Sequence, residues 1–432
     1  MLNFAKKSTV LTVWAASLCL CGTAWSNPHG LSSSGHWALH LPFDLEPSEI
    51  GGGARALGMG NAFVAVADDV RAATVNPAGL SALQQLELAA DLSYSSYEME
   101  YMDTQAAVNN IGVGPALDEI STFDDTVTGL SFAGAAIPII PDRFTAALYY
   151  RSSAVEANDS QNSGPQSVFS SLNVRQQNIS EKSIDEYLKN SYGAAAAFKY
   201  SKMLSFGAGV SLETLNADMR EMWTTNNFNG STPYSSLSYG GRIEGDDTDF
   251  GFNLGVMVTP ISGVSTGLSY RTGSSFSIDY TSMDMDCDSL GHCQNGEEKS
   301  QAAFDTPDIW SAGASWQPAA DWLLSAQADW VGYSALADST TTGITLDEDI
   351  DDEVILRFGA EKTFAMVNDM NYQLRAGLFH IPDHDGFAAL DSDRMHYTLG
   401  GGMTWKKQIK VDLGTSFSED TFNSVLSLTY SL

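Results

Sequence analysis

Residues that commonly carry out catalysis are few in this sequence. Their types and spacing do not form a recognisable active site. None of the histidines has an acid together with a Ser or Cys at a spacing that suggests a catalytic triad. The seven histidines are at positions 29, 36, 40, 292, 380, 384 and 396. The chain is therefore not expected to be an enzyme.

Two short stretches resemble metal sites without completing the pattern. His380 and His384 are close enough in sequence to bind a metal, but an ordinary loop is the favoured interpretation. The alternating aspartates of 284–288 begin like a calcium-binding loop. However, Ser289 stands where such a loop needs Gly, and Asn295 stands where it needs Glu. We expect neither a metal nor another cofactor.

Arginines are the stronger candidates for binding chemistry, because a guanidinium group pairs with a carboxylate or phosphate through two parallel hydrogen bonds. The chain has only 22 Lys and Arg against 53 Asp and Glu. Four arginines lie near the middle of predicted strands and are candidates for holding an anionic head group: Arg151, Arg271, Arg357 and Arg375. The alternative, favoured for any single one, is a structural pair with Glu213, Asp329 or Glu361.

The N-terminus indicates where the protein works. Residues 1–26 begin with Lys6 and Lys7, continue through an apolar run and end in Ala24-Trp25-Ser26. This pattern is typical of a secretory signal peptide, so the mature chain is predicted to begin near Asn27.

The charge of the mature chain excludes one class of partner. Removing the two signal lysines changes the formal net charge from −31 to −33, whereas nucleic-acid binding needs a basic surface. After cleavage only Cys287 and Cys293 remain, six residues apart, and in an oxidising compartment they are predicted to form one loop disulfide.

Segments of about ten residues in which every second position is apolar recur along the chain, as in a transmembrane β-barrel. About fourteen are present, an even number as bacterial barrels require. The clear segments are 86–94, 144–150, 192–200, 206–212, 250–258, 322–330, 354–360, 372–378 and 426–432, and the weaker ones are 127–138, 264–280, 309–317, 395–406 and 409–417. The four arginines fall between the apolar positions and are thus predicted to face the lumen.

Connections between these segments alternate in length, which favours a barrel over a soluble β-sandwich. Short turns are predicted at 138–143, 201–204, 260–264, 318–321, 365–371 and 406–409, and long loops at 103–125, 157–190, 218–240, 281–305, 337–352 and 381–394. Within one of these loops, 180–190 has capping-box spacing and suggests a short helix. Aromatic residues beside the short turns would form an interfacial girdle: Tyr200, Phe206, Trp316, Trp322 and Trp405.

Three segments together resemble the FadL-type (OMPP1/FadL/TodX) outer-membrane transporters of long-chain fatty acids and other hydrophobic compounds. Residues 53–83 look like the N-terminal plug of this family, with Asn76, Pro77 and Ala78 as its motif, and 304–336 and 354–405 look like its later strands. The resemblance implies a plug or hatch at 27–84 that blocks the lumen of a barrel at 85–432, embedded in the bacterial outer membrane.

The resemblance also implies passive uptake of a fatty acid or similar hydrophobic molecule, without enzymatic chemistry. The ligand would leave sideways into membrane lipid beside the third strand, expected at 142–156. The alternating C-terminal strand resembles the signal read by the barrel assembly machinery during biogenesis. Asp68, Asp69 and Arg71 of the hatch are expected to pair with wall charges such as Arg271 or Glu213.

Two alternatives stay open. The stretch 54–69 also resembles PorV-like barrels, which favours a structural or secretion-associated barrel that binds partner proteins. Membrane-embedded hydrolases of this architecture exist as well, so a weak enzyme alternative remains.

Overall fold

Strands make up most of the chain, as the alternating pattern predicts. The computed structural model describes residues 52–102, 120–170, 173–229, 232–287, 293–338, 351–365, 369–382, 394–419 and 421–432. The predicted signal peptide and the first part of the predicted hatch, 27–51, lie outside these ranges. Among the described residues, no helix has the length and apolar character needed to cross a membrane.

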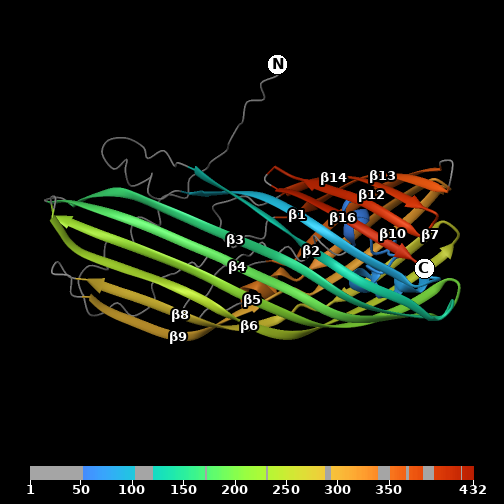
Figure 1. Ribbon diagram of the computed structural model, residues 1–432, viewed down its shortest axis with the longest axis horizontal. Coiled ribbons are helices and arrows are strands. Elements are labelled where there is room, and N and C mark those ends of the chain that lie inside the picture. The colour runs from blue at the N-terminus through green and yellow to red at the C-terminus, as the bar shows by residue number, and fades with distance from the viewer. Residues whose placement is uncertain are drawn as a thin grey trace, which may run out of the picture.

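The strands pair antiparallel and close into one ring (Figure 1). Their bounds are β1 (Glu87–Met102), β2 (Ile120–Ile140), β3 (Phe144–Ser170), β4 (Asn173–Lys199), β5 (Leu204–Asn229), β6 (Thr232–Ile261), β7 (Val264–Arg271), β8 (Ser275–Cys287), β9 (Cys293–Asp305), β10 (Ile309–Ala319), β11 (Trp322–Val331), β12 (Glu353–Ala365), β13 (Met370–Ile381), β14 (Arg394–Trp405), β15 (Ile409–Phe417) and β16 (Thr421–Ser431). The β1–β16 and β5–β6 pairings complete the closure.

The predicted count of fourteen strands is confirmed, although sixteen strand segments are present. β7 and β8 are separated only by 272–274, and β9 and β10 only by 306–308, so each couple is one interrupted crossing of the wall. β8 of the β8–β9 hairpin pairs with β6 at the end far from the short turn. β7 pairs with β10 nearer that turn. The barrel is therefore closed by fourteen crossings.

Three of the predicted long loops are wrong, because the chain there continues as strand. Residues 157–170 belong to β3 and 173–190 to β4, and the helix predicted at 180–190 is part of β4. Residues 218–240 and 281–305 are likewise hairpin strands over most of their length. These hairpins lack apolar alternation because a strand that projects beyond the membrane has no oily face to bury, although its backbone ladder can continue.

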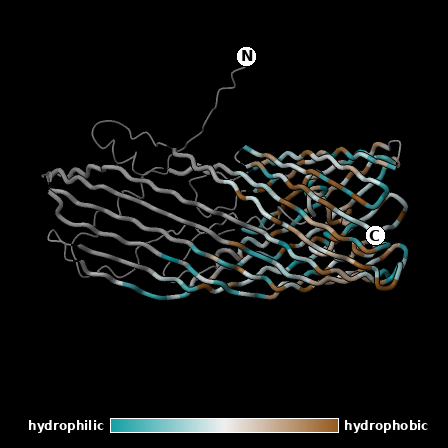
Figure 2. Tube along the Cα trace, in the orientation of Figure 1, coloured by the Kyte–Doolittle hydropathy of each residue, from teal (hydrophilic) through white to brown (hydrophobic). Residues whose placement is uncertain are grey.

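The predicted faces of the wall are confirmed. The large apolar side chains at the predicted lipid-facing positions are exposed, as Leu148 (68%) and Phe250 (63%) illustrate. Between them, Asp91, Arg151 and Arg375 are buried against the lumen contents. The described part of the trace accordingly alternates between apolar and polar along each strand (Figure 2).

Two rows of exposed aromatics frame the apolar band. The predicted row beside the short turns is present, with Tyr200, Phe206, Trp316, Trp322 and Trp405 all exposed. A second row near the long-hairpin end includes Tyr94, Tyr192, Trp310, Trp330 and Tyr397, which are exposed as well. Aromatic side chains at both levels are typical of the two membrane interfaces, and short turns in such barrels face the periplasm.

The N-terminal segment 52–84, which we call the hatch, lies inside the ring (Figure 1). It contains α1 (Gly53–Leu57), α2 (Ala72–Val75) and the 3₁₀ helix η2 (Pro77–Ala82); a second 3₁₀ helix, η3 (Tyr333–Asp338), follows β11. The helices α2 and η2 are separated by Asn76, whose backbone is extended (φ −148°, ψ 95°). The apolar core lies between the hatch and the inner wall, where Val70 and Leu80 pack with Phe132 and Ala195.

Candidate functional site

Glycines of the inner wall provide the surface on which the hatch rests. They form four cross-strand pairs, and a Cβ added at any of them would come within 3.0 Å of a hatch atom. The pairs are Gly207–Gly255, Gly267–Gly313, Gly359–Gly377 and Gly400–Gly414. Such close approach between wall and hatch leaves no room for a side chain on the wall, so the hatch is fitted to these strands in one position.

The motif Asn76-Pro77-Ala78 lies at one of these contacts. The Asn76 side chain donates to the carbonyl of Val64 (2.8 Å) and accepts from the backbone N–H of Ala78 (3.2 Å), which joins two distant parts of the hatch. A Cβ on Gly207 would lie 2.2 Å from both Ala78 N and Pro77 C. Asn76 thus caps the start of η2, and the backbone of Pro77 and Ala78 packs directly against the wall at Gly207.

Two arginines of the hatch carry its charged contacts with the wall. Arg71 pairs with Asp91 of β1, and it also contacts Asp69 (3.2 Å) and the Thr429 hydroxyl (3.0 Å). Burial alone would lower the pKa of Arg71, but the carboxylates of Asp69 and Asp91 outweigh it and the pKa is raised. The guanidinium group therefore stays charged and bound.

The second hatch arginine, Arg55, bridges Asp68 (2.7 Å) and the wall residue Glu361 (3.0 Å). The expected pairing of the hatch acids with Arg271 or Glu213 is wrong. Asp68 and Asp69 instead pair with arginines of the hatch itself, and the wall partners are Asp91 and Glu361. Arg55 was not predicted as a site residue. Its only signal in the sequence is that it is a lone cation in an apolar stretch.

The four wall arginines fall into two classes. Arg375 is a brace: its Nε donates to Glu361 (2.7 Å) and its Nη1 to Asp412 (2.7 Å). Arg357 has one carboxylate partner, Asp329 (2.6 Å from Nε), and the expected roles of Asp329 and Glu361 as brace partners are thus confirmed. Arg151 and Arg271 belong to a separate charged group.

Arg357 is one of the residues that line a small cavity between hatch and wall. Its Nη1 and Nη2 atoms are buried, and neither has a hydrogen-bond partner among the described residues. The guanidinium lies over the ring of Phe379 at 4.8 Å, which orients it. Arg271 and Asp329 line the same cavity on the wall side, and Asn61 and Thr74 line it on the hatch side.

Arg151 and Arg271 interact electrostatically with Lys189 and with Glu213, a buried carboxylate on β5. Glu213 accepts hydrogen bonds from Ser191 (2.6 Å) and Ser211 (2.5 Å), and no ion pair of Glu213 occurs within the described ranges. The Nε atom of Arg151 is buried and has no hydrogen-bond partner among the described residues. Arg151, Arg271 and Lys189 thus gather around Glu213, and Asp329 and Asp249 act on Arg271 and Lys189 as well.

Apolar side chains line the lumen next to these cations. They come from strands on several sides of the barrel and are at most 6% exposed: Leu215, Phe276, Ile278, Tyr280, Ile309, Val331, Ile355 and Phe379. The Lys189 ammonium lies 5.7 Å from the centre of the Phe276 ring, so cationic and apolar groups are in direct contact. Such a surface suits a molecule with an anionic head and an oily tail.

The wall has a seam between β2 and β3. Their ladder runs from Ile140–Phe144 up to Phe132–Arg151, and within the described strands no β2–β3 pair lies above it. β2 continues upward paired with β1, and β3 continues paired with β4. Along 128–130 of β2, three consecutive residues are exposed, which a strand sealed in a closed wall does not show. The described ladder between β2 and β3 thus ends at Phe132–Arg151, while both strands continue beyond it.

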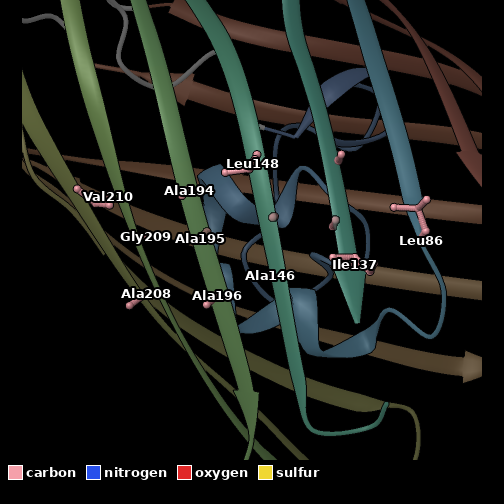
Figure 3. A pocket seen from close by; sticks show the side chains of 13 residues that line it. Leu86, Ile137, Ala146, Leu148, Ala194, Ala195, Ala196, Ala208, Gly209 and Val210 are labelled. Carbon is pink, nitrogen blue, oxygen red and sulfur yellow. The ribbon is translucent and has the colours of Figure 1, made fainter. Parts of the chain in front are cut away.

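Below the seam, the lipid-facing surface is hollowed into an apolar groove of about 650 Å³ across β2 to β5. Small residues such as Ala146, Ala194 and Ala208 form its floor, and Leu148 and Val210 stand at its sides (Figure 3). The neighbouring inward positions Ala147 and Ala195 belong to the core shared with the hatch. The wall here has small side chains on both faces.

The remaining predicted residues are placed as follows. Cys287 and Cys293 lie opposite each other at the end of the β8–β9 hairpin, and the disulfide itself stays a prediction. His384 lies outside the described residues. Within those that are described, no cluster of three His, Cys, Asp or Glu side chains is arranged to hold a metal.

The comparisons with known proteins identify the family. Residues 38–425 match the family model described as outer membrane protein transport protein (OMPP1/FadL/TodX). The chain belongs to this family. It is therefore an outer-membrane transport protein for hydrophobic compounds and is not an enzyme. No curated protein sequence matches the chain.

Solved structures of this family share the fold. A Pseudomonas aeruginosa FadL homologue has 16% identity and a TM-score of 0.59, with 88% of this chain and 98% of that chain covered. The P. putida toluene transporter TodX has 13% identity and a TM-score of 0.61, with 89% and 99% covered. The CymD monoaromatic hydrocarbon channel has 13% identity and a TM-score of 0.56, with 89% and 98% covered.

Proposed function

We propose that this family member takes up hydrophobic molecules with an anionic head, such as long-chain fatty acids, by passive transport. The observation that carries the proposal is the buried pair of Arg357 nitrogens, Nη1 and Nη2, without a hydrogen-bond partner among the described residues. An unsatisfied charged donor in a buried site costs free energy, which a bound carboxylate would recover through two parallel hydrogen bonds.

The surroundings of Arg357 support an amphiphilic ligand. Arg271 adds a second cation to the cavity, and the apolar side chains of Ile309 and Val331 line it too. An anionic head at Arg357 would leave the tail on the long-hairpin side of the hatch, against residues such as Phe276 and Ile355. This arrangement matches head and tail to surfaces of their own polarity.

We further propose that the ligand leaves sideways through the β2–β3 seam. Each CH₂ exposed to water costs about 0.8 kcal/mol, so a lateral path from the apolar lumen into lipid avoids a large barrier for a long chain. The seam begins at Phe132–Arg151, just below Thr128, which pairs with Tyr94 of the second aromatic row. A lateral exit through the seam would therefore lie at the level of the membrane interface.

Uptake by cells that lack their own fatty-acid barrel would test this proposal. The full-length protein is expected to transport radiolabelled dodecanoate faster than empty cells. Arg357→Gln should lower dodecanoate uptake about tenfold, equivalent to losing about 1.4 kcal/mol of charged hydrogen bonding. Uptake of neutral naphthalene should stay unchanged, which controls for folding and for surface expression.

Two other results would contradict the proposal. Equal losses of dodecanoate and naphthalene uptake would assign Arg357 a structural role only. Uptake no faster than in empty cells would favour the alternative of a secretion-associated barrel, for which a stable complex with a partner protein is the positive evidence.

A further inference from the structure

Phe132 and Arg151 are the last facing pair of the β2–β3 ladder, so they form the sill of the seam. A β-bulge lies at the same point: Asp91 of β1 faces Phe132, the next residue Leu92 faces Leu130, and Ser131 is the extra residue. Bulges re-aim side chains and end regular pairing, and they are common beside functional sites. The wall thus changes from closed to open within two residues.

The side chain of Phe132 points inward and is held by the hatch. It is 2% exposed, and its ring lies over Gly134, where a Cβ would come within 2.8 Å of the ring. The Arg71 guanidinium lies 5.7 Å from the ring centre. Val70 of the hatch belongs to the same apolar cluster. The ring is therefore enclosed between the wall and the hatch.

Arg71 is in turn fixed beside this ring by Asp91, the residue that faces Phe132 across the β1–β2 ladder. The same guanidinium therefore makes both an ion pair with the wall and a cation–π contact with the sill. Movement of the hatch that withdraws Arg71 from Asp91 would also uncover the ring of Phe132. Arg71 is therefore the group that joins the hatch to both the wall and the sill.

We propose that Phe132 is the gating residue of the lateral exit and that Arg71 is the positioning residue that couples it to the hatch. The inference rests on the proposed function, since it concerns the regulation of the same exit. With the hatch seated, the ring closes the lumen side of the seam. When Arg71 withdraws, the ring turns off the sill, and the apolar chain passes between Leu130 and β3 into lipid.

Ring size is accordingly a determinant of which ligands leave. In the dodecanoate assay, Phe132→Ala should raise the uptake rate about threefold, and more for a bulkier carboxylate such as 1-pyrenebutanoate. Arg71→Lys keeps a cation for Asp91 but removes the planar group over the ring, and it should raise uptake in the same direction. If Arg71 acts through Phe132, the double variant should match Phe132→Ala alone.

The matched control is Phe358→Ala on β12, which removes the same ring from the lipid face, where it is 47% exposed and away from the hatch. Phe132→Leu keeps apolar bulk and serves if Phe132→Ala fails to fold; it should raise uptake of the bulkier carboxylate. Heat-modifiability on SDS gels verifies that each barrel is folded.

Two results would overturn the inference while leaving the proposed function intact. In the first, the wild type transports dodecanoate but the Phe132 variants behave like Phe358→Ala. In the second, the effects of Arg71→Lys and Phe132→Ala are additive. By contrast, a wild type that transports nothing would refute the proposed function itself.

Discussion

The two ends of the hatch meet the lumen charges in opposite ways. Toward the short turns, Arg375 is bound by two carboxylates, and Glu361 is shared with Arg55 of the hatch. Toward the long hairpins, Arg357 has one carboxylate and two buried nitrogens without hydrogen-bond partners in the described chain. Among the described residues, no buried nitrogen of Arg375 lacks a hydrogen-bond partner, whereas two nitrogens of Arg357 do.

This difference distinguishes a structural arginine, Arg375, from a candidate ligand-binding arginine, Arg357. A buried arginine with all its donors satisfied gains nothing from a ligand anion, whereas one with unsatisfied donors does. The region around Arg375 therefore holds barrel and hatch together. Under the proposed function, a ligand would be retained in the region around Arg357.

The largest effect is expected from breaking the brace. Arg375→Ala leaves Glu361 and Asp412 buried without their shared cation, which should cost about 3–5 kcal/mol of unfolding free energy. Urea titration of the detergent-solubilised barrel would measure it. Arg357→Ala should cost clearly less, because Gln327 still donates to Asp329 (2.8 Å). Equal losses in the two variants would erase the distinction between the two regions.

A smaller effect is expected from displacing the hatch without touching any charge. A Cβ at Gly377 would lie 2.3 Å from Gly60 N, so Gly377→Val should cost about 1–3 kcal/mol by overpacking and loosen the hatch. Planar-bilayer recordings should then show conductance above the wild-type level. Gly401→Val is the control, because its Cβ meets nothing within 4 Å. Equal conductance in both variants would argue against the glycine seat.

If the two unpaired nitrogens of Arg357 bind an anionic ligand, the ligand should raise the free energy of unfolding. Dodecanoate at about ten times its Kd should stabilise the wild type by about 1.4 kcal/mol, because it binds only the folded state. Arg357→Gln should lose most of this gain, measured as the shift in unfolding midpoint. An undiminished shift in the variant would place the ligand elsewhere.

The smallest effect is expected far from both regions, at the tip of the β8–β9 hairpin. Reduction of the predicted Cys287–Cys293 disulfide should change barrel stability by less than about 0.5 kcal/mol, as for other peripheral changes. Thiol alkylation with and without reductant, followed by mass spectrometry, would establish whether the bond exists. Complete alkylation without reductant would rule it out.

The sequence by itself determined the wall. Side chains alternate across a strand, so the phase of apolar residues such as Leu148 and Leu374 settled which face meets lipid and which charges turn inward. The short turns and the first aromatic row followed from the same pattern. The hairpins at 157–190 and 218–240 escaped it, because strands with two wet faces carry no such signal.

Only the tertiary structure decided what the inward residues do. Whether Arg375 braces and Arg357 stays partly unsatisfied depends on strand register and on the hatch, which bring Asp412 beside one and a cavity beside the other. Glycines at inward positions, such as Gly377, can be recognised in the sequence. That they make room for the hatch backbone is evident only from the structure. The sill at Phe132 follows from one bulge and the end of one ladder, and long-range pairing of this kind leaves no local trace in a sequence.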